Sequence, residues 1–487
     1  MMMVKSAFLL ALSMTAFAIL TGHAGESNAN ERPNILLVMA DDQGYGDAGY
    51  NDHPFVKTPH LDAMARDGVV FDHFYAAAPV CSPTRASVMT GRHPFRCNVP
   101  NHGHYMHPAE STIAEALQSV GYVTGHFGKW HIGSVQPESA TSPGGAGFDE
   151  WLSGLNFFDN DPYLSHNGTY KKLEEPGSVI SMDATLEFLR KHAKGDQPMF
   201  AVTWFPAPHD PHQEIPQAID GAATMYQKEA GKKAGYYREI TLLDQQVGRL
   251  RGALKELEIA DNTLLFYCSD NGGLNPQTSG GRAMKGSIYE GGLRVPAILQ
   301  WPSRYQHQVI ATPASTCDLY PTLLAVADVE IEDQPTLDGI NLLPILAGNQ
   351  DQRPPLGFWH GHSQGQSTWS DRIIKSLKEA QDAGKPNPLP QRVLKNVYQY
   401  PKFDRNQATR GHAAWNKWPW KLHRIENKGR VRWELYNLAD DPMERADVSG
   451  DAPDVLESMQ KELEAWQKSV LQSWSGADYG DQKTGAR

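Results

Sequence analysis

Four short, uninterrupted apolar runs, each ending abruptly in polar residues, restrict the fold of this chain more than any other feature. They occupy residues 35–40, 122–127, 199–205 and 263–268. Continuous apolar runs are typical of strands covered on both faces in a parallel sheet, whereas half-exposed strands alternate apolar and polar residues. Ligands bind beyond the carboxyl ends of such strands. The pattern therefore predicts an α/β fold with a site assembled at one edge of the sheet.

Helical patterns lie between and after these runs. Apolar residues from Ile240 to Leu257 keep three- and four-residue spacing, which predicts a helix that covers the sheet with one face. A further helix is expected at residues 370–383.

The last part of the chain predicts a small antiparallel sheet. Strand-like runs at 418–423 and 431–436 are joined by a turn sequence at 427–429, which is typical of a hairpin. An apolar stripe at 456–470 follows, and it predicts a helix with Asp451 as its N-cap.

The N-terminus has the features of a signal peptide. Lys5 precedes an apolar and small-residue run at 7–20, and small residues stand before the expected cleavage after Ala24. The run is too short to span a bilayer comfortably. We therefore expect an exported protein, periplasmic or secreted, without a stable membrane anchor. A retained anchor is the alternative.

Charge and cysteine content exclude some classes of function. The 487-residue chain has 45 Lys and Arg against 56 Asp and Glu, a formal net charge of −11, and it has no basic patch suited to nucleic acid. An acidic protein gains nothing from long-range steering of anions, so an anionic substrate would depend on local cations and a metal. Four cysteines in a chain of this length do not make a disulfide framework, and we expect Cys268 to be buried and free.

Two of the apolar runs end in groups suited to a hard metal ion. Asp41 and Asp42 follow the first run, and Asp270 and Asn271 follow the fourth. Adjacent carboxylates repel each other unless a cation lies between them. Three carboxylates and an amide suit Ca²⁺ or Mg²⁺. Turn or helix-capping roles are the alternative for each residue.

The stretch from Cys81 to Arg92, Cys-Ser-Pro-Thr-Arg-Ala-Ser-Val-Met-Thr-Gly-Arg, resembles the signature of the type I, formylglycine-dependent sulfatases. In that family a modifying enzyme reads Cys-x-Pro-x-Arg and oxidises the cysteine to formylglycine. One hydroxyl of the hydrated aldehyde is the nucleophile, and the second lets the sulfated diol collapse and expel sulfate. The resemblance implies that a formylglycine-generating enzyme converts Cys81 during maturation. A half-cystine or a buried hydrophobic residue is the alternative.

The residues at 128–133, Gly-Lys-Trp-His-Ile-Gly, resemble a second signature of the same family, and 285–296 is a further family-like block. The resemblance implies that two lysines neutralise sulfate oxygens. It also implies one histidine at the formylglycine hydroxyl, one near the leaving-group oxygen, and an arginine that holds the formylglycine. The implied catalytic residues are Cys81, Arg85, Lys129, His131, His209 and Lys285. Beyond Lys285, we interpret Glu290 and its neighbours as structural, in tight turns and a buried ion pair.

The resemblance also completes the metal site. It implies that Asp41, Asp42, Asp270 and Asn271 bind one divalent ion, usually Ca²⁺ with Mg²⁺ as the alternative, together with the formylglycine at Cys81. Asp270 would serve as base for the attacking hydroxyl as well.

The implied architecture is alkaline-phosphatase-like: a mixed, mostly parallel sheet sandwiched by helices, with a smaller C-terminal antiparallel sheet and helix. We expect a signal peptide at 1–24, a catalytic domain at 25–357, a variable specificity segment at 358–414 and a C-terminal subdomain at 415–487.

The implied function is hydrolysis of a sulfate ester on a sulfated small molecule or glycan. We expect residues near 360–415 to line the rim of the pocket and select a sulfated carbohydrate, namely His360, His362, Trp369, Arg410, His412 and Trp415. Packing of these tryptophans against the C-terminal sheet is the alternative. Two other functions stay open: a phosphoester or phosphonate-ester hydrolase, and a non-catalytic binder of sulfated glycans.

Overall fold

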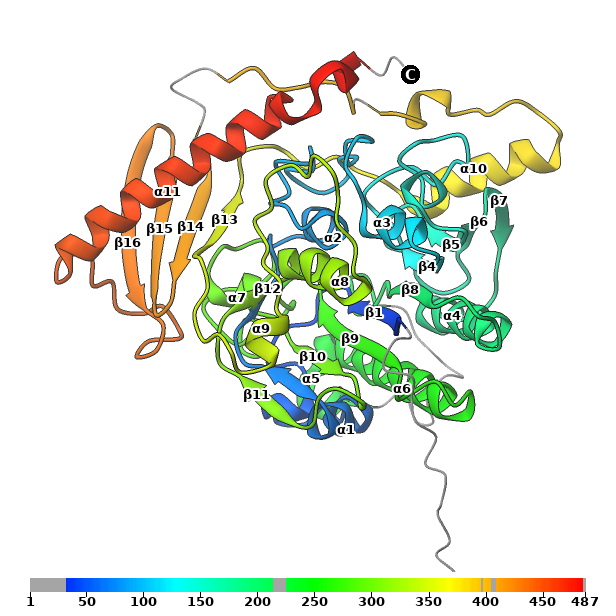
Figure 1. Ribbon diagram of the computed structural model, residues 1–487, viewed down its shortest axis with the longest axis horizontal. Coiled ribbons are helices and arrows are strands. Elements are labelled where there is room, and N and C mark those ends of the chain that lie inside the picture. The colour runs from blue at the N-terminus through cyan, green and yellow to red at the C-terminus, as the bar shows by residue number, and fades with distance from the viewer. Residues whose placement is uncertain (1–31, 213–224, 396, 404–408, 485–487) are drawn as a thin grey trace, which may run out of the picture. The chain divides into compact units, whose positions relative to one another are not determined.

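A ten-stranded sheet forms the centre of the structure, a computed structural model that describes residues 32–212, 225–395, 397–403 and 409–484 (Figure 1). Its middle strands run in the order β9, β1, β8, β4, and neighbouring strands pair in parallel. These are the four predicted apolar runs: β1 (Asn34–Ala40), β4 (Val123–Lys129), β8 (Met199–Trp204) and β9 (Thr263–Ser269). The prediction of a parallel α/β sheet is confirmed. The predicted signal peptide at 1–24 lies outside the described residues.

Shorter strands extend the sheet at both sides. On one side β5 pairs in parallel with β4 and leads into an antiparallel hairpin, and on the other side β10 pairs antiparallel with β9. These strands are β5 (Glu150–Gly154), β6 (Tyr163–His166), β7 (Thr169–Lys172), β10 (Ala297–Gln300), β2 (Val69–Phe71) and β11 (Gln308–Ile310). Two further strands, β3 (Phe74–Tyr75) and β12 (Ala314–Ser315), pair with each other.

Successive residues of β1 enter two separate hydrophobic cores. Ile35, Leu37 and Met39 pack on one face, and Leu36 and Val38 on the other. The first core contains residues of α2 (Cys81–Thr90), α3 (Ile113–Ser119), α8 (Leu319–Ala327), α9 (Leu343–Leu346) and α10 (Ser370–Asp382). The second contains residues of α1 (Pro59–Asp67), α4 (Gly177–His192) and α6 (Ala234–Glu256). Both faces are covered, which explains why the strands are continuously apolar.

Helix α6 confirms the amphipathic pattern. Ile240, Leu243, Val247, Leu250 and Leu254 are all buried on the side that faces the sheet or its flanking loops. The helix expected at 370–383 is confirmed as α10. Two short helices, α5 (Gln227–Ala230) and α7 (Glu290–Leu293), complete this part of the chain.

A four-stranded antiparallel sheet lies beside the main sheet, and α11 (Pro453–Trp474) packs across it (Figure 1). Its strands are β13 (Leu356–His360), β14 (His412–Lys417), β15 (Trp420–Asn427) and β16 (Arg430–Asn437). The predicted hairpin is β15 and β16, and it is confirmed. The paired strands β13 and β14 lie at the two ends of the segment predicted at 358–414, whose boundaries stay a prediction.

The predicted N-cap of α11 is wrong. Ala452, not Asp451, is the N-cap residue, and it makes no side-chain capping bond. The helix begins at Pro453, whose fixed φ favours the first helical position. The backbone N–H of Asp451 instead donates to the carbonyl oxygen of Val448 in the preceding turn.

All four cysteines are buried and unbridged, as expected for Cys268. Within the described ranges, no helix combines the length and apolar character that a membrane crossing requires.

Candidate active site

The carboxyl ends of β1 and β9 bring the four predicted oxygen ligands together. The Asp42 backbone N–H donates to Asp270 Oδ1 at 3.1 Å, and Asn271 Nδ2 donates to Asp42 Oδ1 at 2.7 Å. All four side chains, including Asp41, are fully buried. Asp42 has a φ of 75°, in the left-handed region that non-glycine residues rarely adopt. Backbone strain of this kind is found where a site must aim a side chain.

Each of the three carboxylates has its own cation. Lys129 Nζ lies 2.6 Å from Asp41 Oδ2, Lys285 Nζ lies 2.6 Å from Asp42 Oδ2, and Arg85 Nη2 lies 2.6 Å from Asp270 Oδ2. Three negative and three positive charges therefore cancel within one buried cluster. Burying either set alone would be costly, so the pairs stabilise each other.

The pKa values in this cluster reflect that pairing. Burial is the largest single influence and alone would raise the pKa of Asp41 and Asp42. The nearby cations together outweigh it and hold both pKa values below the usual range, with Lys129 acting most on Asp41 and Lys285 most on Asp42. The pKa of Asp270 is raised, because burial and the nearby Asp41 carboxylate outweigh its cations. Asp270 therefore has the highest proton affinity relative to its ordinary value among the three.

Two buried oxygens in the cluster point to a missing ligand. Asp41 Oδ1 and Asn271 Oδ1 have no hydrogen-bond partner, although buried polar atoms are normally satisfied. Ligand atoms of Asp41, Cys81 and Asp270 also lie within 4.8 Å of one another. Carboxylate and amide oxygens are the donors that hard divalent cations prefer. The residues present therefore fit a divalent ion.

Cys81 is the first residue of α2 and faces the cluster. Its Sγ lies 3.3 Å from Nδ1 of His131, a residue just beyond β4 with a positive φ of 60°. Burial raises the pKa of the Cys81 thiol despite the nearby Lys129 and Lys285. Burial and the positive charge of Lys129 lower the pKa of His131 well below its usual value. The pair is therefore a neutral thiol beside a neutral imidazole, which is a poor arrangement for a thiolate nucleophile.

Arg85 lies one turn after Cys81 on α2. Its Nε and Nη2 donate to Asp270 Oδ2 at 3.1 and 2.6 Å, and its Nη1 donates to the Lys129 carbonyl at 2.8 Å. The guanidinium thus joins α2 to the ends of β9 and β4.

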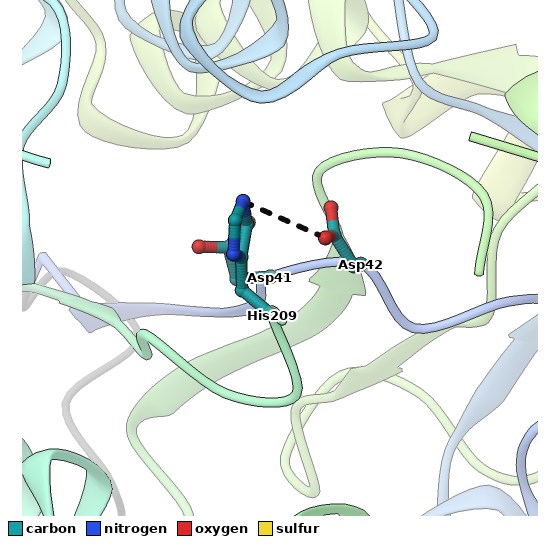
Figure 2. A group of neighbouring side chains, drawn as sticks. All are labelled: Asp41, Asp42 and His209. Atoms are coloured by element: carbon teal, nitrogen blue, oxygen red, sulfur yellow. Dashed lines mark ion pairs between the residues drawn. The ribbon is translucent and has the colours of Figure 1, made fainter. Parts of the chain in front are cut away.

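His209 enters the site from the loop after β8. Figure 2 shows its ring facing Asp42, with Nε2 3.8 Å from Asp42 Oδ2. The ring also stacks on Phe157, with centroids 4.8 Å apart. Burial lowers the pKa of His209, although the carboxylates of Asp42 and Asp41 oppose that effect.

A cavity of about 510 Å³ opens above these groups. That volume is in the range of small-molecule sites. It is lined by Val80, Cys81, Asn101, His102, His131, Asn156, His209, Lys285, Gly286, His360, Gln366, Ser367, Thr368 and Trp369. Four of the six predicted catalytic residues reach the cavity wall, and the other two, Arg85 and Lys129, are fully buried.

Five of the six predicted rim residues divide into two groups, and the sixth, Arg410, is exposed and does not line the cavity. His360 and Trp369 line the cavity, as expected. Trp415 is 9% exposed and packs against Trp466 in the core of the small sheet, so its predicted rim position is wrong.

The same correction holds for two histidines of the segment. His412 Nε2 lies 2.8 Å from His423 Nδ1 within the small sheet. The His362 ring packs edge-on against Trp474 of α11. Both histidines therefore contribute to the packing of the small sheet and α11 and do not line the rim of the cavity.

Several cavity residues were not named by the prediction, although Gln366 and Thr368 lie within the segment expected at the rim. They are Asn101, His102, Asn156, Gln366 and Thr368. The histidine-rich stretch at 101–107 is the one signal that could have suggested the first two. Asn156 and Thr368 carry no sequence signal, because loop contacts alone bring them to the cavity.

Comparison with known proteins agrees with this architecture. Residues 33–329 match the sulfatase family model, and the chain belongs to the sulfatase family. N-acetylgalactosamine-6-sulfatase of Sus scrofa is 31% identical over 380 residues, covering 70% of each chain. Human arylsulfatase A is 32% identical over 374 residues, covering 67% of this chain and 70% of the relative.

A solved structure, that of Ps i-CgsB in complex with k-i-k-neocarrahexaose, is similar over nearly the whole chain. It has a TM-score of 0.74 and 26% identity, and the match covers 94% of this chain and all of that one. The alkaline-phosphatase-like fold is thus confirmed. The protein is a sulfuric ester hydrolase.

Proposed function

We propose that this sulfatase is an exported enzyme that removes sulfate from a carbohydrate, with formylglycine at position 81 as its nucleophile. The observation that carries the proposal is the buried cluster of paired charges directly behind Cys81. Two similar proteins support the substrate class: one is named for a sulfated amino sugar, and the other was solved with a bound carrahexaose.

The state of Cys81 supports its conversion. A buried thiol with a raised pKa stays protonated at neutral pH and is a weak nucleophile. A formylglycine-generating enzyme would supply the oxidant during maturation and replace CH₂SH by CHO. The hydrated aldehyde supplies a hydroxyl for attack on sulfur and a second hydroxyl for release of sulfate.

The surrounding residues have distinct roles in this proposal. Asp270, with its raised pKa, accepts the proton of the attacking hydroxyl. His131 contacts residue 81 and assists its second hydroxyl. His209 serves the leaving-group oxygen. Lys285, which lines the cavity, neutralises charge on the sulfate oxygens, and the buried Lys129 adds positive charge behind them.

The hydrogen bonds of Arg85 run to Asp270 and to the Lys129 backbone, so we assign it the positioning of those two groups beside residue 81.

Asp41, Asp42, Asp270 and Asn271 would hold the metal ion, which we propose to be Ca²⁺. The ion would polarise the sulfate and the hydroxyl of residue 81. Because the charges of the cluster already cancel, a divalent cation leaves an excess of positive charge. That excess suits an anionic sulfate ester in a protein whose overall charge is −11.

The cavity wall fits a sugar. Lys285 is the one lysine or arginine among the residues that line it, and its other polar groups are imidazoles, amides and hydroxyls. Burial lowers the pKa of His360 to about 4, so this imidazole is neutral at the pH of most extracellular environments. Neutral hydrogen-bonding groups and the ring of Trp369 suit hydroxyl groups and sugar faces.

Parallel assays test the proposal. The purified protein is given 4-nitrophenyl sulfate, 4-nitrophenyl phosphate, a phosphonate monoester and a panel of sulfated saccharides. We expect turnover of the aryl sulfate and of at least one sulfated saccharide, with sulfate as the measured product. Preferred turnover of the phosphorus esters would overturn the sulfate assignment, and turnover of the aryl sulfate alone would overturn the carbohydrate. N-terminal sequencing of the native protein tests export, since the mature chain should begin after Ala24.

A further inference from the structure

A second cavity, of about 300 Å³, lies next to the catalytic one. We call it the Lys395 cleft, and it is lined by Asn98, Pro100, His104, Tyr105, Ser363, Gln366, Lys395, Gln399, Tyr400, Pro401 and Trp474. Gln366 lines both cavities, so the two share a wall. The function proposed above does not use this cleft.

Lys395 is a half-buried cation without an acidic partner among the described residues. Its Nζ donates to the Gly103 carbonyl at 3.1 Å and lies 5.5 Å from the centre of the Tyr105 ring. No ion pair of the described chain includes Lys395 or its neighbour Arg392. Burial and the positive charge of Arg392 lower the pKa of Lys395 to about 8. A half-buried cation that has a second cation nearby and no carboxylate partner among the described residues favours an anion as its partner.

Backbone contacts hold the cleft in a fixed relation to the nucleophile. Gly103, whose carbonyl accepts from Lys395, donates its N–H to Ser82 Oγ at 3.1 Å, and Ser82 is the residue after Cys81. The Gln366 N–H donates to the His102 carbonyl at 2.9 Å. Gly103 has a φ of 75°, and a Cβ atom there would lie 1.9 Å from the Gln366 carbonyl oxygen, so the two loops need glycine to meet.

We propose that the Lys395 cleft binds a second anionic substituent, sulfate or carboxylate, on the same saccharide chain whose sulfate ester occupies the catalytic cavity. The inference deepens the proposed function and rests on it. It assigns the enzyme to oligosaccharides or polymers with repeated negative charge. In an acidic protein, an unpaired cation beside the cavity supplies local attraction that the overall charge does not.

The experiment compares KM for three matched oligosaccharide series with KM for 4-nitrophenyl sulfate, which is too small to span both cavities. Iota-carrageenan fragments carry more sulfate than kappa-carrageenan fragments of the same length, and chondroitin sulfate fragments carry carboxylates as well. The variants are Lys395→Ala, Lys395→Arg and the control Lys375→Ala. Lys375 is exposed on α10 in the same part of the chain and does not line either cavity.

For Lys395→Ala we expect KM for a doubly charged series, divided by KM for the aryl sulfate, to rise about tenfold, the effect of losing one hydrogen bond to a charged group. A rise with iota-carrageenan identifies sulfate, and a rise with chondroitin sulfate but not with iota-carrageenan identifies carboxylate. Lys375→Ala should leave every ratio unchanged. For substrates that bind but are not turned over, inhibition of aryl sulfate hydrolysis replaces KM.

The pH dependence separates binding from a structural role. The other titratable groups around Lys395 are Arg392, His104, Tyr105 and Tyr400. Lysine is charged below its pKa, so the wild-type preference for doubly charged chains should fall as pH rises through about 8. The arginine of Lys395→Arg stays charged over this pH range. This variant should therefore keep the preference for doubly charged chains above a pH of about 8, where the wild type loses it.

Equal KM ratios for wild type and Lys395→Ala in every series would overturn the inference. That result leaves the proposed function intact if a sulfated saccharide is still hydrolysed. Absence of any saccharide turnover or inhibition would instead refute the proposed function, and the inference with it.

Discussion

The hydroxyl of Thr368 lies 3.4 Å from Nε2 of His131, on the side of the ring opposite Cys81. Thr368 belongs to the segment predicted at 358–414 as variable, whereas His131 belongs to a family-like signature. The contact therefore connects a loop that lines the cavity to the imidazole beside Cys81. The backbone of Thr368 is held as well, since Asn156 Nδ2 donates to the Thr368 carbonyl at 2.9 Å.

Replacing this hydroxyl tests whether it positions His131. Thr368→Val keeps the shape of the side chain and removes its hydrogen bond, so we expect kcat for 4-nitrophenyl sulfate to fall about threefold to tenfold, the effect of one hydrogen bond. Thr368→Ser restores the hydroxyl and should recover most of the rate. The melting temperature should change little in either variant. A normal kcat in Thr368→Val would show that the contact is only packing.

Cys81 should be absent as a thiol from the active enzyme. Mass spectrometry of the peptide that contains it should show a mass lower by the difference between CH₂SH and CHO. Cys81→Ala should lose turnover altogether. Cys81→Ser offers a single hydroxyl, so it should become sulfated once and stop, and the sulfated serine is detectable by the same method. Full activity of a protein whose residue 81 remains a thiol would contradict the mechanism.

Removal of the metal should lower stability as well as activity. The unpaired oxygens of Asp41 and Asn271 lose their partner without the ion. A ligand present at a hundred times its Kd stabilises the folded state by about 2.7 kcal/mol, so chelation should lower the melting temperature measurably. Added Ca²⁺ should restore both properties, and Mg²⁺ serves as the comparison.

Asp42→Ala should bind no ion by elemental analysis and should not respond to Ca²⁺. An identical melting curve and rate before and after exhaustive chelation of the wild-type enzyme would refute the site.

The sequence predicted the parts of the fold that depend on local pattern. The middle strands are rich in apolar residues because both faces are covered, and the ends of β1 and β9 deliver Asp41, Asp42, Asp270 and Asn271 to one edge. The amphipathic helices were predictable too, because each buries one face and therefore repeats apolar residues at helical spacing.

Long-range pairing was not predictable in this way. Strand β13 is short, and its partner β14 lies beyond α10, with Leu356 opposite Asn416. Neither strand carries enough apolar alternation to reveal the pairing. The rim of the cavity depends on it, because the segment between the two strands carries Thr368 and Trp369 to the site.

A buried cation joins the small sheet to the main body. Lys421 of β15 lies 2.8 Å from Glu290 of α7 and 3.1 Å from Glu444, and all three are nearly inaccessible to solvent. The structural role expected for Glu290 is thus borne out by this buried pair. Lys421→Ala leaves two buried carboxylates without their cation, so we expect a loss of about 3–5 kcal/mol in unfolding free energy.

Chemical denaturation measures that loss, and the double variant Lys421→Ala with Glu290→Gln should recover part of it. Lys417→Ala is the control, because Lys417 pairs with Glu462 at the surface and should cost less than 1 kcal/mol. Similar losses for both lysines would contradict the assigned role of Lys421.

Trp369 is the most exposed large hydrophobic side chain among the described residues, at 69%, and it stands at the mouth of the catalytic cavity. The Leu155 N–H donates to Ser370 Oγ at 3.1 Å, so the backbone beside the ring is held in place while the ring itself stays open to solvent. Trp369→Ala should raise KM for a sulfated saccharide several-fold to about tenfold, as expected for 0.5–1.5 kcal/mol of stacking. Trp369→Phe keeps an aromatic ring, so it should raise KM less than Trp369→Ala does. Trp418→Ala, at an exposed tryptophan away from the cavity lining, is the matched control. If KM for saccharides is the same in wild type and Trp369→Ala, the sugar does not stack on this ring, and the neutral groups of the cavity wall alone select it.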